Sequence, residues 1–182
     1  MKMKKILTVA VAAAGLLGGY VAHADEAKRT VGEYTDDKVL HTKVWAALTD
    51  DKTADANEIN LEVYKGVVQL NGFVDNEKEK AQAESVAKAV SGVKGVENNL
   101  VIKDAKQTTG GAIDDSTVTA KVKTALTDSA ETKAHDIKVA TRGGVVQLSG
   151  FVENEAQKAA ATKVAQAVEG VKSVNNSISV RN

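Results

Sequence analysis

Residues 66–74 read GVVQLNGFV and return almost unchanged as residues 144–152, GVVQLSGFV, which is an offset of 78 positions. At that offset residues 36–103 align with residues 114–181 without a gap, and about half of the aligned positions are identical. Such self-similarity at a fixed spacing is the signature of an internal repeat. The chain is therefore expected to contain two copies of one folding unit.

A β-hairpin is predicted around this motif. Apolar and polar residues alternate over residues 59–64, which is typical of a half-buried strand, and residues 67–70 can fold back as a second strand. Gly66 lies between them, where glycine accepts the positive φ of a tight turn. Gly72 interrupts the second strand, which indicates a bulge or a close approach by a helix that leaves no room for Cβ. The same positions in the second repeat are Gly144 and Gly150.

A helix is expected before each hairpin. Leu40, Val44 and Leu48 recur at helical spacing, and Val118, Val122 and Leu126 match them in the second repeat. Aspartates stand where these helices are expected to begin, and carboxylates there cap free N–H groups and interact favourably with the helix dipole. They are Asp36 and Asp37 in the first repeat and Asp114 and Asp115 in the second.

A second helix is expected after each hairpin. Asn76 followed by Glu79, and Asn154 followed by Gln157, resemble a capping box at its start. The glycines just beyond its end suit a left-handed C-cap, and they are Gly92 and Gly170. A last strand follows, with one face formed by Val96, Asn98, Leu100 and Ile102 and, in the second repeat, by Val174, Asn176, Ile178 and Val180.

The predicted fold class is α+β, with two tandem α-β-β-α-β domains. Because the strands are apolar on one side, two helices should cover one face of a three-stranded sheet in each domain. The expected boundaries are a leader at residues 1–24, a flexible arm at 25–35, the first domain at 36–103, a linker at 104–113 and the second domain at 114–181.

The first 24 residues have the order of a secretory signal: Lys2, Lys4 and Lys5, then an apolar run, then Ala22-His23-Ala24. A permanent membrane anchor is the alternative, but the run is short and rich in Gly and Ala. Cleavage is expected after Ala24, which predicts an exported periplasmic protein. Removal of the three lysines changes the formal net charge from zero to −3, which argues against a general nucleic-acid binder.

Composition gives little support for catalysis or for cofactor binding. The chain has no Cys, which excludes disulfides, thiol catalysis and Cys-ligated zinc. His41 and His135 occupy non-equivalent positions in the two repeats, and the carboxylates are scattered along faces expected to be solvated. The repeated glycines lack the Lys of a phosphate-binding loop, since Phe73 and Phe151 follow them. A protein that is not an enzyme and carries no cofactor or metal is predicted.

The residues that carry a family resemblance are G-V-V-x-L-x-G-x-V in the hairpin and G-V-x-x-V-x-N after the second helix. Together with the α-β-β-α-β order, they resemble the BON domain, and the resemblance covers both repeats. It implies a periplasmic or envelope role, association with phospholipid surfaces and protection under osmotic stress. It provides no catalytic residue.

Trp45 is the residue that the repeat itself does not explain. Its partner in the second repeat is Lys123, and on a helical wheel it lies beyond the apolar face, on a stripe with Lys38 and His41. A Trp beside cations suits a lipid headgroup interface. Packing of Trp45 against the other repeat or the arm is the competing interpretation.

The expected partners are an anionic phospholipid surface or, alternatively, unfolded envelope proteins held by a chaperone-type activity. A purely structural role in an envelope complex comes third. Lys121 and Lys123 could contact anionic headgroups from the second repeat, although an ordinary solvated helix face is the favoured explanation for them.

Overall fold

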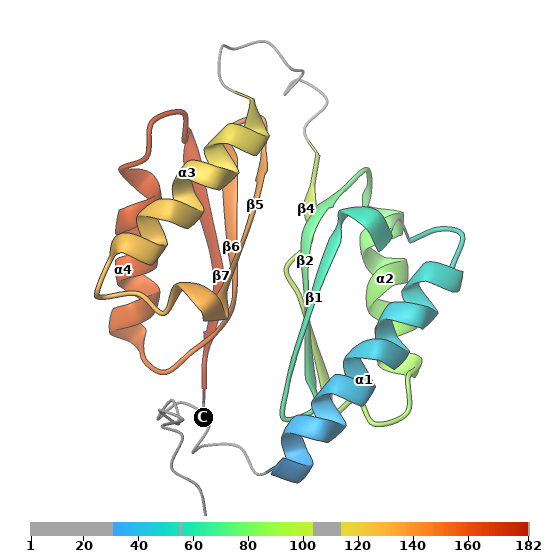
Figure 1. Ribbon diagram of the computed structural model, residues 1–182. Coiled ribbons are helices and arrows are strands. Elements are labelled where there is room, and N and C mark those ends of the chain that lie inside the picture. Colours follow the sequence, from blue (N-terminus) through green and yellow to red (C-terminus); the bar gives the residue numbers. More distant parts are fainter. Residues whose placement is uncertain (1–30, 55, 104–113, 182) are drawn as a thin grey trace, which may run out of the picture.

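A computed structural model describes residues 31–54, 56–103 and 114–181. The predicted leader, most of the predicted arm and the predicted linker lie outside these residues. Figure 1 shows two similar units whose sheets face each other, with the helices of each unit on the outer side of its own sheet. The repeats thus form four layers, helices, sheet, sheet and helices.

The first repeat has the predicted order of elements. Its helices and strands are α1 (Val31–Asp50), the 3-10 turn η2 (Ala56–Glu58), β1 (Ile59–Tyr64), β2 (Val67–Val74), α2 (Glu77–Ala89), β3 (Gly95–Asn98) and β4 (Val101–Ile102). The last predicted strand is thus divided in two. Leu100, in the break between β3 and β4, is buried in the core.

The second repeat follows the same order with a continuous last strand. Its elements are α3 (Asp115–Asp128), the 3-10 turn η3 (Ala134–Asp136), β5 (Ile137–Arg142), β6 (Val145–Val152), α4 (Glu155–Gln166) and β7 (Ser173–Val180). The central strand of each sheet is the second one: β2 and β6 pair antiparallel with the strand before them and parallel with the strand after α2 or α4.

The first helix begins earlier than predicted. Because α1 starts at Val31, Asp36 and Asp37 lie inside it and do not cap its start. Asp37 is buried and accepts hydrogen bonds from the backbone N–H groups of Lys65 and Gly66, both at 2.8 Å, so it holds the hairpin turn.

In the second repeat, one aspartate of the pair caps the helix and the other binds the hairpin turn. Asp114 caps α3 by accepting from the backbone N–H of Ser116, as predicted. Asp115 accepts from the N–H groups of Gly143 and Gly144, at 2.6 and 2.9 Å. The aspartate pair therefore ties the first helix of each repeat to its hairpin.

The capping predictions for α2 and α4 are confirmed. Asn76 accepts from the N–H of Glu79, and Asn154 accepts from the N–H of Gln157, each at 2.9 Å. The glutamate completes the box by accepting from the N–H of Asp75.

Gly72 and Gly150 are required by a close approach. The antiparallel pairing reaches them in continuous register, without a bulge, because Ile59 pairs with Gly72 and Ile137 pairs with Gly150. Gly72 has φ +125°, and a Cβ there would lie 2.0 Å from the carbonyl oxygen of Glu58. Gly150 has φ +118° and would meet the carbonyl oxygen of Asp136 at the same distance. The approaching group is thus the end of a short 3-10 turn.

The inner face of each sheet is also buried, which the alternation of β1 did not predict. Gln69 and Gln147, at equivalent positions of β2 and β6, are almost inaccessible to solvent. The Gln69 side-chain oxygen accepts from the N–H of Gly150 at 2.9 Å, and that of Gln147 accepts from the N–H of Gly72 at 2.6 Å.

The side-chain amide nitrogens of Gln69 and Gln147 also form hydrogen bonds to the opposite repeat. Gln69 donates to the carbonyl of Ser177 at 2.9 Å, and Gln147 donates to the carbonyl of Asn99 at 2.6 Å. Asn99 and Ser177 occupy equivalent positions in the two repeats. Tyr64 also stacks on Phe151, with ring centroids 5.2 Å apart. The repeats are therefore joined through a pseudo-two-fold interface of reciprocal hydrogen bonds.

Candidate binding surfaces

The outer face of α1 carries the exposed apolar residues of the described chain. Trp45 is 39% exposed and Val39 is 49% exposed, and these are the two large apolar side chains in the described residues that stand out to solvent. Figure 1 places α1 on the outer side of the first sheet, away from the interface between the repeats. The described part of the second repeat therefore does not cover Trp45.

The predicted stripe of Trp45 is exposed as a whole. Lys38 and His41 are exposed like Trp45, while Leu40 and Val44 on the neighbouring face are buried. The backbone carbonyl of Trp45 accepts a hydrogen bond from the hydroxyl of Thr49, one turn further along α1. The structure thus brings the three stripe residues together on one solvent-facing flank of α1.

The two lysines proposed in the second repeat differ in their surroundings. Lys121 and Lys123 are both exposed on α3. Lys121 forms an ion pair with Glu169 at 3.0 Å, in the loop after α4. Lys121 therefore already has a carboxylate partner, and Lys123 occupies the place of Trp45.

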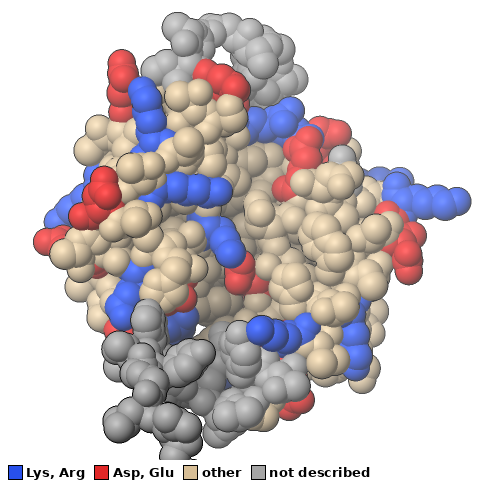
Figure 2. All heavy atoms as spheres, viewed as in Figure 1, with Lys and Arg blue, Asp and Glu red and all other residues tan. Residues whose placement is uncertain are grey.

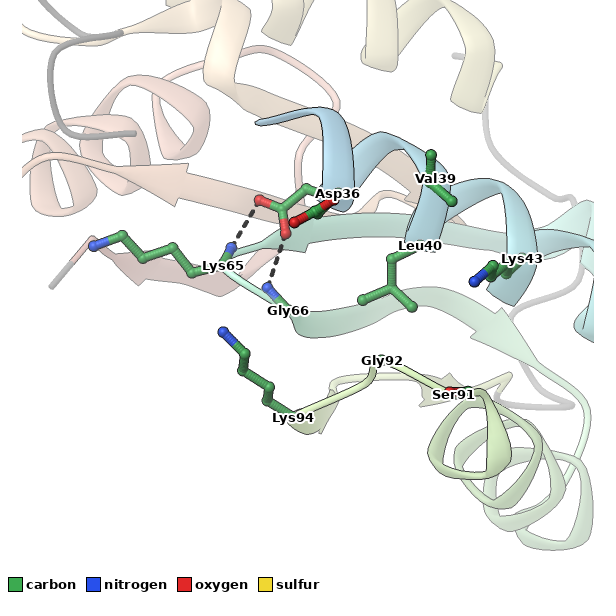
Figure 3. Close-up of a pocket in the computed structure, with 10 residues that line it drawn as sticks. Asp36, Val39, Leu40, Lys43, Lys65, Gly66, Ser91, Gly92 and Lys94 are labelled. Atoms are coloured by element: carbon green, nitrogen blue, oxygen red, sulfur yellow. Dashed lines mark hydrogen bonds between the residues drawn. The ribbon is translucent and has the colours of Figure 1, made fainter. Parts of the chain in front are cut away.

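A surface pocket of about 270 Å³ lies on the other flank of α1. It is formed by α1, by the hairpin turn and by the loop after α2 (Figure 3). Its lining is Asp36, Asp37, Val39, Leu40, Lys43, Lys65, Gly66, Ser91, Gly92 and Lys94.

Lysine side chains dominate the charge of this pocket. Figure 3 shows Lys43 on α1, and Lys94 extending from the loop after α2 toward the hairpin turn. The ammonium group of Lys65 lies 5.5 Å from the centre of the Tyr64 ring, so this lysine is engaged by the aromatic ring. Lys43 and Lys94 are therefore the cations available to the pocket.

Sequence reasoning missed this pocket, because its residues come from three separate segments. Val39, Lys43 and Lys94 gave no motif on their own. The alignment of the two repeats contained a signal, because these positions differ between them: Val39 aligns with Thr117, and Ser91 aligns with Glu169.

An ionic cluster at the edge of the first sheet explains a shifted pKa. Lys103 contacts Glu58 at 2.7 Å and Asp75 at 2.8 Å. The hydrogen bond and the charge of Lys103 hold the pKa of Asp75 below its usual value. The two carboxylates share one ammonium group, so the charges of this cluster are paired with one another.

Nothing in the described residues points to a metal centre or a membrane span. No group of three or more His, Asp or Glu residues is close enough there to hold a metal ion. None of the helices within residues 31–54, 56–103 and 114–181 combines the length and apolar character needed to cross a bilayer.

Comparison with known proteins agrees with the geometry. The BON domain family matches residues 36–104 and 114–182, which are the two repeats. The chain belongs to the BON domain family. The predicted resemblance and the predicted α+β tandem are thereby confirmed.

Three curated relatives match along most of their length. The chain is 37% identical to the osmotically-inducible protein Y of Escherichia coli over 158 residues, covering 86% of this chain and 79% of the relative. It is 35% identical over 164 residues to the outer membrane lipoprotein DolP of Haemophilus influenzae, covering 88% and 84%. It is also 33% identical to a 21 kDa hemolysin of Actinobacillus pleuropneumoniae, covering 80% and 75%.

Proposed function

We propose that this tandem BON protein is a non-enzymatic protein of the bacterial envelope that associates weakly with anionic phospholipid surfaces through α1. The observation that carries the proposal is the exposed Trp45, which neither the core of its repeat nor the described part of the other repeat uses. The names of two relatives, an osmotically-inducible protein and an outer membrane lipoprotein, support an envelope role connected with osmotic stress.

The chemistry of the Trp45 flank fits a headgroup layer. An indole has a large apolar ring and one N–H donor, so it is favoured where apolar and wet regions meet. Lys38 and His41 on the same flank are exposed and can approach phosphates. Further burial of the exposed part of the indole would contribute roughly 1–2 kcal/mol by area.

The overall charge fits weak binding. Each Lys or Arg near an anionic membrane contributes about 1 kcal/mol, but strong binding needs several together. On the face shown in Figure 2, basic and acidic side chains are interspersed over both repeats. The proposed affinity is therefore low and reversible.

A chaperone-type activity is the second candidate, and it has less support. Capture of unfolded proteins requires a sizeable exposed apolar surface. The described chain exposes Trp45 and Val39 on different flanks of one helix, and the inner faces of both sheets are buried against each other.

Tryptophan fluorescence tests the proposal directly, because Trp45 is the only tryptophan in the sequence. Vesicles of phosphatidylglycerol should shift its emission to shorter wavelength and sediment the protein, whereas phosphatidylcholine vesicles should do neither. Trp45→Lys, which installs the residue found in the second repeat, should abolish sedimentation.

A matched control separates the Trp45 flank from general charge. Lys123→Gln changes the equivalent position of α3 and should leave sedimentation unchanged. An emission spectrum that does not respond to anionic vesicles would reject the proposed site. Suppression of aggregation of an unfolded outer-membrane protein, lost in Trp45→Lys without any vesicle binding, would favour the chaperone-type activity.

A further inference from the structure

We infer that the inner face of each repeat is also a docking surface for a second copy of this chain, so that two chains exchange repeats and form a closed dimer. In this exchanged dimer the first repeat of each chain pairs with the second repeat of the other chain. The inference concerns the faces between the two sheets and does not rest on the proposed membrane contact.

The two repeats can separate without losing their cores. Each hydrophobic core is formed by residues of one repeat alone, from Leu40 to Leu100 in the first and from Val118 to Ile178 in the second. The contacts between the repeats include the reciprocal glutamine bonds, one ring stack and ion pairs between partly exposed side chains. Because water satisfies the polar groups when the faces part, opening the interface is much less unfavourable than unfolding a repeat.

The interface contacts specify which repeat is bound, not which chain supplies it. Gln69 binds main-chain groups of Gly150 in β6 and Ser177 in β7, and Gln147 binds those of Gly72 and Asn99 in the first repeat. The same bonds form when the partner repeat belongs to a second copy, which is the physical basis of domain swapping. Two chains that exchange repeats form two such interfaces and leave no inner face open, so the assembly closes at two copies.

An ion pair at the edge of the interface favours the pairing of unlike repeats. The ammonium group of Lys138 in β5 lies 3.6 Å from a carboxylate oxygen of Glu62 in β1. By the repeat alignment, two first repeats would place Glu62 opposite Asn60, and two second repeats would place Lys138 opposite Ala140. Either pairing of like repeats therefore loses this ion pair, whereas exchange between two chains keeps it.

Glu97 adds a second preference for unlike repeats. Its half-buried carboxylate accepts hydrogen bonds from the side-chain amide of Gln69 at 3.0 Å and from the hydroxyl of Ser179 at 2.6 Å. Ser179 belongs to the second repeat, and Val101 occupies its position in the first. Two first repeats would set the Glu97 carboxylate against the apolar Val101, which is unfavourable for a charge removed from water.

Protein concentration decides whether a repeat pairs within its own chain or with a second copy. Residues 104–113 join the repeats, and a connection this short favours pairing within the chain in dilute solution. Since the exchanged dimer has the same contacts, a second copy competes at concentrations on the order of millimolar. The dimer is therefore the minor species in dilute protein, and its fraction increases with concentration.

Cross-linking of the mature full-length protein detects the exchange without native thiols, because the sequence has no Cys. Glu62→Cys and Lys138→Cys are purified separately, mixed at about 0.1 mM, below the millimolar range of competition, and treated with a short bismaleimide. Each chain carries one thiol, and the two thiols face each other only in the exchanged dimer. Because the reaction is irreversible, covalent dimer accumulates, and its yield should exceed that of the controls roughly tenfold.

Two control mixtures replace Lys138→Cys. Asn60→Cys carries its thiol at the equivalent, exposed position of the first repeat and captures pairing between two first repeats. Lys163→Cys carries it on the exposed side of α4 and reports random collisions. Equal yields from the three mixtures, or no covalent dimer of Glu62→Cys with Lys138→Cys, would overturn the inference.

A second measurement requires no thiols. Glu62→Lys and Lys138→Glu each place like charges across their own interface, and a mixture of the two variants restores attraction only when the chains exchange repeats. In sedimentation velocity the mixture should dimerise roughly tenfold more tightly than either variant alone, because two repulsions are removed and two attractions gained, each equivalent to a factor of about two.

A mixture that sediments like its separate components would contradict the exchange. Thermal unfolding of each variant, with a midpoint close to that of the wild type, verifies that it is folded. Both experiments contain no lipid, so their outcome is separate from the vesicle test of the Trp45 flank.

Discussion

The two faces of the central strands are both buried, yet they have opposite chemistry. Toward the helices, β2 presents Val68, Leu70 and Val74, which belong to the core of the first repeat. Toward the other repeat, the same strand presents Gln69 and Asn71, which are equally inaccessible but polar. β6 divides in the same way.

The apolar face and the polar face of each central strand therefore have different roles. An apolar face stabilises the unit without directional preference, because burial depends on area. A face of buried amides stabilises only the arrangement that satisfies each donor and acceptor, because an unpaired buried polar group is unfavourable by about 1–3 kcal/mol. The helix-covered face therefore stabilises each repeat, and the inner face fixes how one repeat sits on the other.

The largest effect is expected on the apolar face. Leu148→Ala should lower the free energy of unfolding by about 3–5 kcal/mol, because it leaves a cavity in a fully buried core. Urea denaturation measures the change in the full-length protein and in fragment 112–182. Equal losses in both are expected; a loss confined to the full-length protein would mean that the core depends on the other repeat.

Gly72→Val should be nearly as damaging, with a loss of about 2–5 kcal/mol. The new Cβ would collide with the Glu58 carbonyl and require a positive φ. Gly95→Ala is the matched control, since a Cβ added at Gly95 would have no atom within 4 Å, and it should be close to neutral. Similar stabilities for the two variants in thermal unfolding would contradict the close approach.

Gln147→Ala probes the inner face. Removing its amide leaves the N–H of Gly72 and the carbonyl of Asn99 without their partner, which should lower the stability of the full-length protein by about 1–3 kcal/mol.

The same change in fragment 112–182 should have almost no effect, because there the side chain faces water. We propose that fragments 25–106 and 112–182 each unfold cooperatively, since each repeat contains its own core. A random-coil far-UV spectrum for either fragment would show that the repeats share one core.

A small effect is expected from the ion pairs around the interface. Arg142 lies 3.5 Å from Glu58, and Lys138 lies 3.6 Å from Glu62, with partly exposed side chains. Arg142→Ala should change the stability by less than about 1 kcal/mol, and the change should shrink in high salt. A larger, salt-independent loss would assign Arg142 a packing role.

The smallest effect concerns pH. Lys103 lowers the pKa of Asp75, so the pair stabilises the fold at neutral pH, and the contribution is lost as the pH falls through the lowered pKa. Any stability difference between the wild type and Asp75→Asn should therefore be present at pH 7 and vanish well below the ordinary aspartate pKa of 3.8. A difference that persists in acid would have another cause.

The sequence was sufficient for the order of elements, because periodicity, turn glycines and the Asn caps all act locally. It was insufficient for the inner face. Gln69 and Phe73 repeat in both motifs at positions that alternation assigns to solvent, and a buried phenylalanine on that side was the available signal. The pocket of Lys43 and Lys94 escaped prediction because it exists only after three segments have come together.

Aspartate pairs show the same limit on a smaller scale. Asp37 was predicted to cap a helix, a local role, yet its carboxylate binds a turn 28 residues later. Asp114, whose partner is two residues away, was predicted correctly. Interactions between distant segments depend on the fold that they help to build, so a single sequence does not reveal them.

The reciprocal bonds of Gln69 and Gln147 have a consequence for the encounter of the two surfaces. Each repeat carries the donor and the acceptor that the other needs, as the two halves of a symmetric dimer do. Joining them in one chain replaces a bimolecular association by an intramolecular one, for which the effective concentration is on the order of millimolar when the linker is short. Formation of the interface therefore does not depend on how much protein the cell makes.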